Sequence, residues 1–227
     1  MFFLTVRHFA RCFSFLAILL CLPAFLSAQN AAVPSVTFSL TFPGSQPDRY
    51  VVIVPLSGSA TYSSDGKLME GGDAEDFKLI FPISQDTRAH IFDVAKKAHY
   101  FSEQVDSKKK NMAFTGTKVL VYNDGQKENR VSYNYTTVTP VQELTQLFQN
   151  MSATLEFGRR LEYYHRYQKL ALDEELKRME EMANENQLHE LSAVGPVLQQ
   201  IAEDNTVINP VRARAQRLLA RAGAAQK

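Results

Sequence analysis

The chain has no tryptophan and only two cysteines among its 227 residues, and its charges almost cancel, with 25 Lys plus Arg against 24 Asp plus Glu. A net charge of +1 argues against a dedicated nucleic-acid-binding protein, which normally carries a strongly basic domain. Apolar residues make up 45% of the chain, as in a globular protein rather than a disordered or collagen-like one. The composition therefore predicts one or two folded domains that do not bind nucleic acid.

The first 28 residues have the pattern of a secretory signal peptide. Arg7 and Arg11 precede an apolar run from Cys12 to Leu26. This run of about 15 residues is shorter than the ~20 that a membrane-spanning helix needs. We expect cleavage after Ala28, a secreted or periplasmic protein, and no membrane span in the remaining chain. An uncleaved N-terminal anchor is the alternative.

Cleavage after Ala28 removes both cysteines and leaves 199 residues, of which 23 are basic and 24 acidic. A chain without cysteine has no thiol nucleophile, no Cys-ligated zinc, no iron-sulfur cluster and no disulfide. Its stability must come from the burial of a hydrophobic core, and about 200 residues are enough for that.

Residues 36 to 135 predict an antiparallel sheet with one packed helix. Val36, Phe38 and Leu40 alternate with hydroxyl-bearing residues, which is the period of a half-buried strand. Asn123-Asp124-Gly125 predicts a hairpin turn. A helix that starts near Ser84 or Asp86 carries an apolar stripe toward the sheet. The other candidate strands cover residues 50–54, 59–63, 77–83, 118–122 and 130–135.

After Pro140 the apolar spacing becomes that of helices. The seam consists of residues three and four positions apart, namely Val141, Leu144, Phe148, Met151, Leu155 and Gly158. We expect one long helix to run to about Ala183 and to be followed by short helices at 188–194, 196–203 and 210–222. The predicted class is α+β, with an α+β domain over 29–157 and a helical region over 158–227.

Residues 36–157 resemble small secreted bacterial α+β domains of unknown function. The similarity rests on a strand meander with the turn Ser64-Asp65-Gly66, a helix that ends in Tyr100-Phe101, and a helix that begins at Pro140-Val141. The segment from Leu188 to Leu219 is similar to one HEAT-type helical repeat. Neither resemblance implies an activity.

Residues 159–169 concentrate tyrosine, arginine and histidine on a helix that is apolar on two sides. Either the helix is sandwiched between the sheet and the C-terminal helices, or one aromatic side is an exposed contact patch, since Tyr and Arg are enriched at binding hot spots. Arg214, Arg217 and Arg221 form a row on the last predicted helix. Their charges either stabilise the helix dipole or bind a phosphate-bearing envelope polymer. The candidate partner-contact residues are Arg160, Tyr163, His165, Tyr167, Arg214, Arg217 and Arg221.

Two groups of residues raise the question of a metal. Glu162 and His165 have the Glu-x-x-His spacing of di-iron bundles, but the second copy that such sites need is missing. Asp86, His90 and Asp93 share a helix face, for which a solvated charged surface is the simpler interpretation. We therefore predict no metal, no cofactor and no catalytic residue. Phosphate-binding loops, dinucleotide-binding glycine patterns and zinc-protease motifs are absent from the sequence.

These observations predict a secreted or periplasmic, non-enzymatic interaction protein that contacts a protein or an envelope polymer. Two alternatives stay open. One is a hydrolase that acts on envelope material with Glu162 and His165 as acid-base groups, and the other is a structural assembly protein. The sequence predicts neither the partner nor the oligomeric state.

Overall fold

The computed structural model describes residues 33–68 and 72–224. The signal peptide expected over residues 1–28 lies outside this part of the chain. Within the described residues, no helix combines the length and the apolar character that crossing a bilayer requires.

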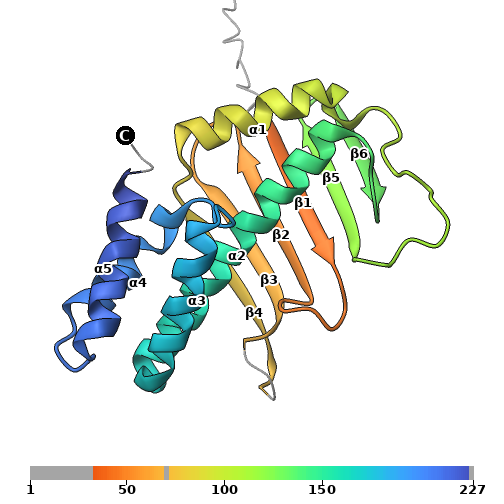
Figure 1. Cartoon of the computed structure of the whole chain (residues 1–227). Coiled ribbons are helices and arrows are strands. Elements are labelled where there is room, and N and C mark those ends of the chain that lie inside the picture. Colours follow the sequence, from red (N-terminus) through yellow and green to blue (C-terminus); the bar gives the residue numbers. More distant parts are fainter. Residues whose placement is uncertain (1–32, 69–71, 225–227) are drawn as a thin grey trace, which may run out of the picture. The chain divides into compact units, whose positions relative to one another are not determined.

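Six antiparallel strands form one sheet in the order β4-β3-β2-β1-β5-β6 (Figure 1). The first four strands form a meander, and β5 returns to pair with the free edge of β1, so that Phe38 lies opposite Leu120. The predicted α+β class is confirmed. The strands are β1 (Ser35–Thr41), β2 (Arg49–Pro55), β3 (Ala60–Lys67), β4 (Ala74–Phe81), β5 (Thr117–Asn123) and β6 (Glu128–Tyr133).

The sheet has one buried face and one face that is partly exposed. Val36, Phe38 and Leu40 of β1 are at most 8% exposed, whereas the serines and threonines between them are only partly buried. Helices α1 (Gln85–Lys97) and α2 (Thr139–Tyr167) cross the buried face (Figure 1). The Phe148 ring of α2 stacks on the Phe38 ring at 5.3 Å between centroids. The predicted alternation of strand β1 therefore decides where the helices pack.

The helix expected to run to about Ala183 is in fact two helices. α2 ends at Tyr167, a 3-10 turn follows at Lys169–Ala171, and α3 covers Leu172–Asn184. The reversal buries Leu172, Leu176 and Met179 completely against α2 and the later helices. Each such side chain contributes about 1.5–3 kcal/mol when buried, whereas each lost backbone hydrogen bond costs about 1 kcal/mol. Tertiary packing therefore outweighs a local sequence that contains no helix breaker.

The remaining helices are α4 (Gly195–Glu203) and α5 (Asn209–Ala224). The helix expected at 188–194 is only a 3-10 turn at Leu191–Val194. Glu190, just before it, has a left-handed backbone with φ of 58°. Its carboxylate accepts hydrogen bonds from the Ser84 amide at 3.0 Å and the Ser84 hydroxyl at 2.7 Å. This contact connects the 3-10 turn before α4 to the start of α1.

Two hydrophobic clusters form the core, and α2 contributes to both. The first lies between the sheet and the helices α1 and α2, and it includes α2 residues up to Leu155. The second lies among the helices of the C-terminal part and includes Phe157 and Leu161 of α2. α2 is therefore the element that connects the two clusters.

Candidate functional site

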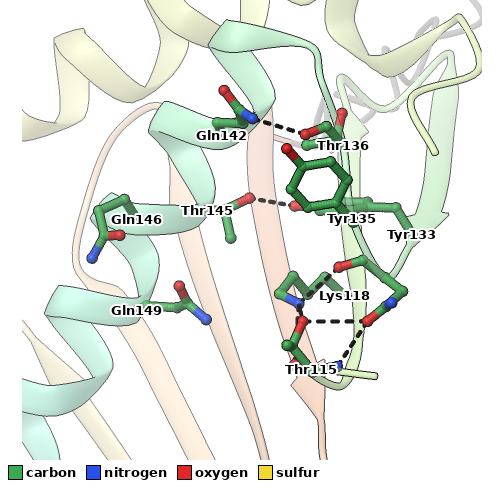
Figure 2. A pocket seen from close by; sticks show the side chains of 10 residues that line it. Thr115, Lys118, Tyr133, Tyr135, Thr136, Gln142, Thr145, Gln146 and Gln149 are labelled. Carbon is green, nitrogen blue, oxygen red and sulfur yellow. Dashed lines mark hydrogen bonds between the residues drawn. The ribbon is translucent and has the colours of Figure 1, made fainter. Parts of the chain in front are cut away.

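A cavity of about 290 Å³ lies between the ends of β5 and β6 and the first half of α2 (Figure 2). We call it the glutamine pocket. Figure 2 shows three glutamines of α2 on one side and Lys118 with Thr115 on the other. The lining residues are Thr115, Lys118, Tyr133, Asn134, Tyr135, Thr136, Gln142, Thr145, Gln146 and Gln149. This lining contains one lysine and no carboxylate.

Lys118 is the buried cation of this pocket, with only 6% of its surface exposed. Its Nζ donates to the Thr115 carbonyl at 3.1 Å, the Thr115 hydroxyl at 3.0 Å, the Asn134 carbonyl at 3.0 Å and the Gly116 carbonyl at 3.4 Å. Within the described residues no carboxylate lies within 4.0 Å of this ammonium group. Burial lowers the pKa of Lys118 below its ordinary value, because the charged form loses hydration that neutral acceptors replace only in part.

The opposite wall of the glutamine pocket is polar and uncharged. Gln142, Gln146 and Gln149 are four and three residues apart, so they share one face of α2. Gln142 donates its amide to the Thr136 carbonyl at 2.8 Å, and Gln146 donates to Asn150 at 2.7 Å. Both glutamines therefore keep a carbonyl oxygen as a free acceptor.

A buried hydroxyl pair holds α2 against the sheet at the base of the pocket. Tyr133 and Thr145 share a hydrogen bond of 2.6 Å between their hydroxyl oxygens. Burial raises the pKa of Tyr133 to about 12. This tyrosine is consequently neutral at physiological pH and serves as a structural contact rather than as a base.

A second surface lies at the other end of α2, where the Tyr163 and Tyr167 rings contact each other at an angle of 52° with centroids 5.1 Å apart. Tyr167 is 64% exposed, and Leu170 just beyond it is 94% exposed. A cavity of about 480 Å³ lies between these tyrosines and the β3–β4 hairpin. We call it the aromatic cleft, and its lining residues are Leu68, Gly72, Asp73, Glu75, Tyr163 and Tyr167.

Segment 159–169 was expected to be either a sandwiched helix or an exposed patch, and the structure shows a different environment for its two halves. Up to Leu161, which is fully buried, the helix is sandwiched between its neighbours. From Tyr163 onward one side of the helix, with Tyr163 and Tyr167, lines the cleft, whereas Tyr164 packs against the second hydrophobic cluster. Sandwich and exposed patch are thus successive parts of the same helix.

His165 is paired with a carboxylate from the loop after α4. Its Nε2 lies 2.9 Å from Asp204 Oδ2, and Lys169 Nζ lies 2.6 Å from the same oxygen. The hydrogen bonds from Lys169, from Thr206 and from His165 hold the pKa of Asp204 well below its ordinary value. His165 lines neither the glutamine pocket nor the aromatic cleft, and the Glu162 side chain points to solvent. This arrangement is an ion-pair network between α2 and the loop before α5.

The four candidate arginines are engaged in contacts within the chain. Arg160 Nε donates to Glu175 Oε1 at 2.6 Å, with its guanidinium 4.8 Å from the centre of the Phe157 ring. The other three connect α5 to α3. Arg214 bonds Asp173 and Glu180, Arg217 bonds Glu180, and Arg221 bonds Asn184 and Asn186.

The residues considered for a metal do not gather into a site. His90 pairs with Glu143 at 2.8 Å, and Asp93 pairs with Lys97 at 2.7 Å. Among the described residues no three His, Cys, Asp or Glu side chains are placed to hold a metal ion.

Glu156 is a buried carboxylate that connects α2 to β3. Its Oε1 accepts hydrogen bonds from the Tyr62 hydroxyl and the Ser64 hydroxyl, both at 2.7 Å. Arg159 lies 3.8 Å from the other oxygen and 5.1 Å from the centre of the Phe77 ring. Burial, followed by the nearby Glu156 charge, raises the pKa of Tyr62 well above its ordinary value. Among the described residues no fully buried side-chain nitrogen or oxygen lacks a hydrogen-bond partner, so this cluster stabilises the docking of α2.

Sequence reasoning did not identify the glutamine pocket. Lys118 lies on the same strand face as Leu120, so its position pointed to an inward lysine. The spacing of Gln142, Gln146 and Gln149 pointed to a polar stripe beside the apolar seam. That the two meet could not be read from the sequence, because it depends on the angle at which α2 crosses the sheet.

Neither a scan against protein-family models nor a search of curated proteins finds a match for this chain.

Proposed function

We propose that this chain is a non-enzymatic binding protein that works in a secreted or periplasmic setting and recognises a basic segment of a protein partner through the aromatic cleft. The compartment rests on the sequence of residues 1–28. The observation that carries the proposal is that the partly exposed Tyr163 and the exposed Tyr167 line one cavity with Asp73 and Glu75. The Glu75 carboxylate lies 3.8 Å from Arg159 but remains largely exposed.

The chemistry of the aromatic cleft suits an arginine or lysine side chain. A cation can interact favourably with the face of a tyrosine ring and with a nearby carboxylate at the same time. Arg166 already lies 5.8 Å from the centre of the Tyr167 ring, so this ring is placed where a guanidinium can reach it. The exposed Leu170 offers an apolar contact beside the charged one.

The two alternative functions have less support. A hydrolase needs a reactive group that faces a cavity, whereas His165 lines neither the glutamine pocket nor the aromatic cleft. A structural assembly protein needs a self-complementary surface, and the aromatic cleft carries acids without a matching basic patch among its own lining residues. We therefore develop only the binding function.

The test measures the binding of two fluorescein-labelled peptides to the full chain by anisotropy. One peptide alternates Arg with Leu, and the other alternates Glu with Leu. We expect the basic peptide to bind, and its binding to weaken as salt is added. The Tyr167→Ala variant should bind this peptide about tenfold more weakly. Asp73→Asn should weaken it as well, since it removes a carboxylate from the cleft.

Tyr135→Ala is the matched control, because Tyr135 is another partly exposed tyrosine that lies in the glutamine pocket. It should leave peptide binding unchanged. Equal binding of the acidic peptide, or full binding by Tyr167→Ala, contradicts the proposal. Self-association of the chain by light scattering that disappears with Tyr167→Ala would replace it with the assembly function.

A further inference from the structure

The glutamine pocket contains a positive charge that the described chain does not neutralise. All four oxygen atoms around Lys118 Nζ belong to carbonyls or a hydroxyl. A buried ammonium group with only neutral partners keeps much of its desolvation cost, and an incoming anion reduces that cost. The nearest acid that precedes Lys118 in the chain is Asp106, which pairs with Thr136 through its main chain and whose carboxylate accepts a hydrogen bond from the Lys108 amide. The pocket therefore favours an anionic ligand.

The other residues that line the pocket indicate which uncharged groups the ligand carries. Gln142 and Gln146 keep free carbonyl oxygens, and the Gln149 amide has no hydrogen-bond partner among the described residues. The Tyr135 ring is 37% exposed at the rim, with Lys109 Nζ 6.0 Å from its centre. Amide oxygens accept from hydroxyl groups, and an aromatic face packs on the C–H groups of a saturated ring. Together they match a small molecule with many hydroxyl groups.

We propose that the glutamine pocket binds a sugar acid, with its carboxylate on Lys118 and its hydroxyl groups on the glutamines of α2. The cavity volume of about 290 Å³ is near the lower limit of small-molecule sites, which suits a single sugar unit. The longest of the Lys118 contacts, 3.4 Å to the Gly116 carbonyl, is the one that a ligand oxygen replaces at least cost. This site is separate from the aromatic cleft and does not depend on the function proposed for it.

The experiment is calorimetric titration of the full chain with D-glucuronate, D-glucose and acetate, supported by amide chemical shifts. Glucuronate should bind at least about tenfold more tightly than glucose, which lacks the carboxylate, and than acetate, which lacks the hydroxyl groups. The shift changes should centre on Lys118, Asn134 and Gln149. Equal affinity for all three ligands, or no binding of glucuronate at millimolar concentration, overturns the proposal.

Two variants locate the binding. Lys118→Met removes the charge but also the hydrogen bonds that the ammonium group donates to the loop, so a loss of binding there has two causes. Gln149→Glu keeps those bonds and adds a carboxylate to the wall, so it should weaken glucuronate binding at least about tenfold with the fold intact. Gln200→Glu makes the same charge change on an exposed site of α4 and should leave binding unchanged. Full binding by Gln149→Glu overturns the proposal.

Discussion

At the scale of single residues, Gly158 shows how closely α2 and the turn before α4 approach each other. The sequence placed this glycine inside a helix, where it costs about 1 kcal/mol relative to alanine. A Cβ at this position would lie 2.5 Å from Val194 Cγ1 and 3.3 Å from Val194 Cβ. Val194 is itself 96% buried, with a β-branched side chain that cannot rotate freely. The glycine is therefore required by packing between α2 and the turn before α4.

Gly158→Ala should destabilise the chain by about 1–3 kcal/mol, because the steric clash outweighs the gain in helix propensity. Urea unfolding followed by circular dichroism measures the change. In a double-mutant cycle, Val194→Ala should relieve part of the clash, with a coupling of at least about 0.5 kcal/mol. Stabilisation by Gly158→Ala alone would contradict this account of the contact.

At the scale of elements, α5 is held to α3 by a carboxylate between two arginines. Glu180 Oε1 accepts from Arg217 Nε at 2.6 Å, and its Oε2 accepts from Arg214 Nε at 3.2 Å. The bonds from Arg217 and then from Arg214 lower the pKa of Glu180 from its ordinary value of 4.5. Arg214 and Arg217 of α5 therefore bind the neighbouring helix α3.

This lowered pKa predicts a pH dependence of stability. The folded chain keeps Glu180 ionised at a lower pH than the unfolded chain does, so the unfolded chain binds more protons in that range. The ion pairs contribute fully above about pH 4.5 and are lost as the pH falls below it. Between pH 6 and pH 3.5, the free energy of unfolding should decrease more in the natural chain than in Glu180→Gln. Parallel urea titrations at four pH values measure this difference, and identical slopes would argue against it.

The elements were largely predictable from the sequence, since alternation and turn residues are local signals. The strand that contains Phe38 and the hairpin at Asn123-Asp124-Gly125 lie where their patterns predicted them. The break at Gln168 was missed, because its cause is the burial of Leu172 against residues far away in the sequence. Local rules identify where a helix can continue, and long-range packing decides where it ends.

The candidate sites were less predictable than the elements. Tyr163 and Tyr167 were identified as contact candidates from their place on a helix that is apolar on two sides, and their contact on one side of α2 follows from their spacing. The acids of the aromatic cleft, Asp73 and Glu75, lie about ninety residues earlier around the start of β4, so no local pattern connects them with the tyrosines. Lys118 was missed for the same reason, because a buried charge is recognised only when its surroundings are known.

At the scale of the whole described chain, the two hydrophobic clusters depend on one helix. Phe148 of α2 belongs to the first cluster and Leu161 to the second, and both are fully buried. Because α2 belongs to both clusters, unfolding of α2 removes contacts from both, and neither cluster should unfold by itself. We expect a single cooperative unfolding transition.

Phe148→Ala and Leu161→Ala test this coupling from opposite ends. The first should cost about 3–5 kcal/mol and the second about 2–5 kcal/mol, which are usual values for buried side chains of these sizes. In both variants, near-ultraviolet dichroism of the tyrosines and far-ultraviolet dichroism of the backbone should give the same midpoint. Two separated midpoints in either variant would show that the clusters unfold independently.

The length of α2 sets the distance between the two proposed binding sites. Gln149, in the glutamine pocket, and Tyr163, in the aromatic cleft, lie on the same 29-residue helix. At about 1.5 Å per residue they are about 21 Å apart along its axis. A sugar acid bound in the glutamine pocket and a peptide bound in the aromatic cleft would therefore be held at a fixed distance from each other.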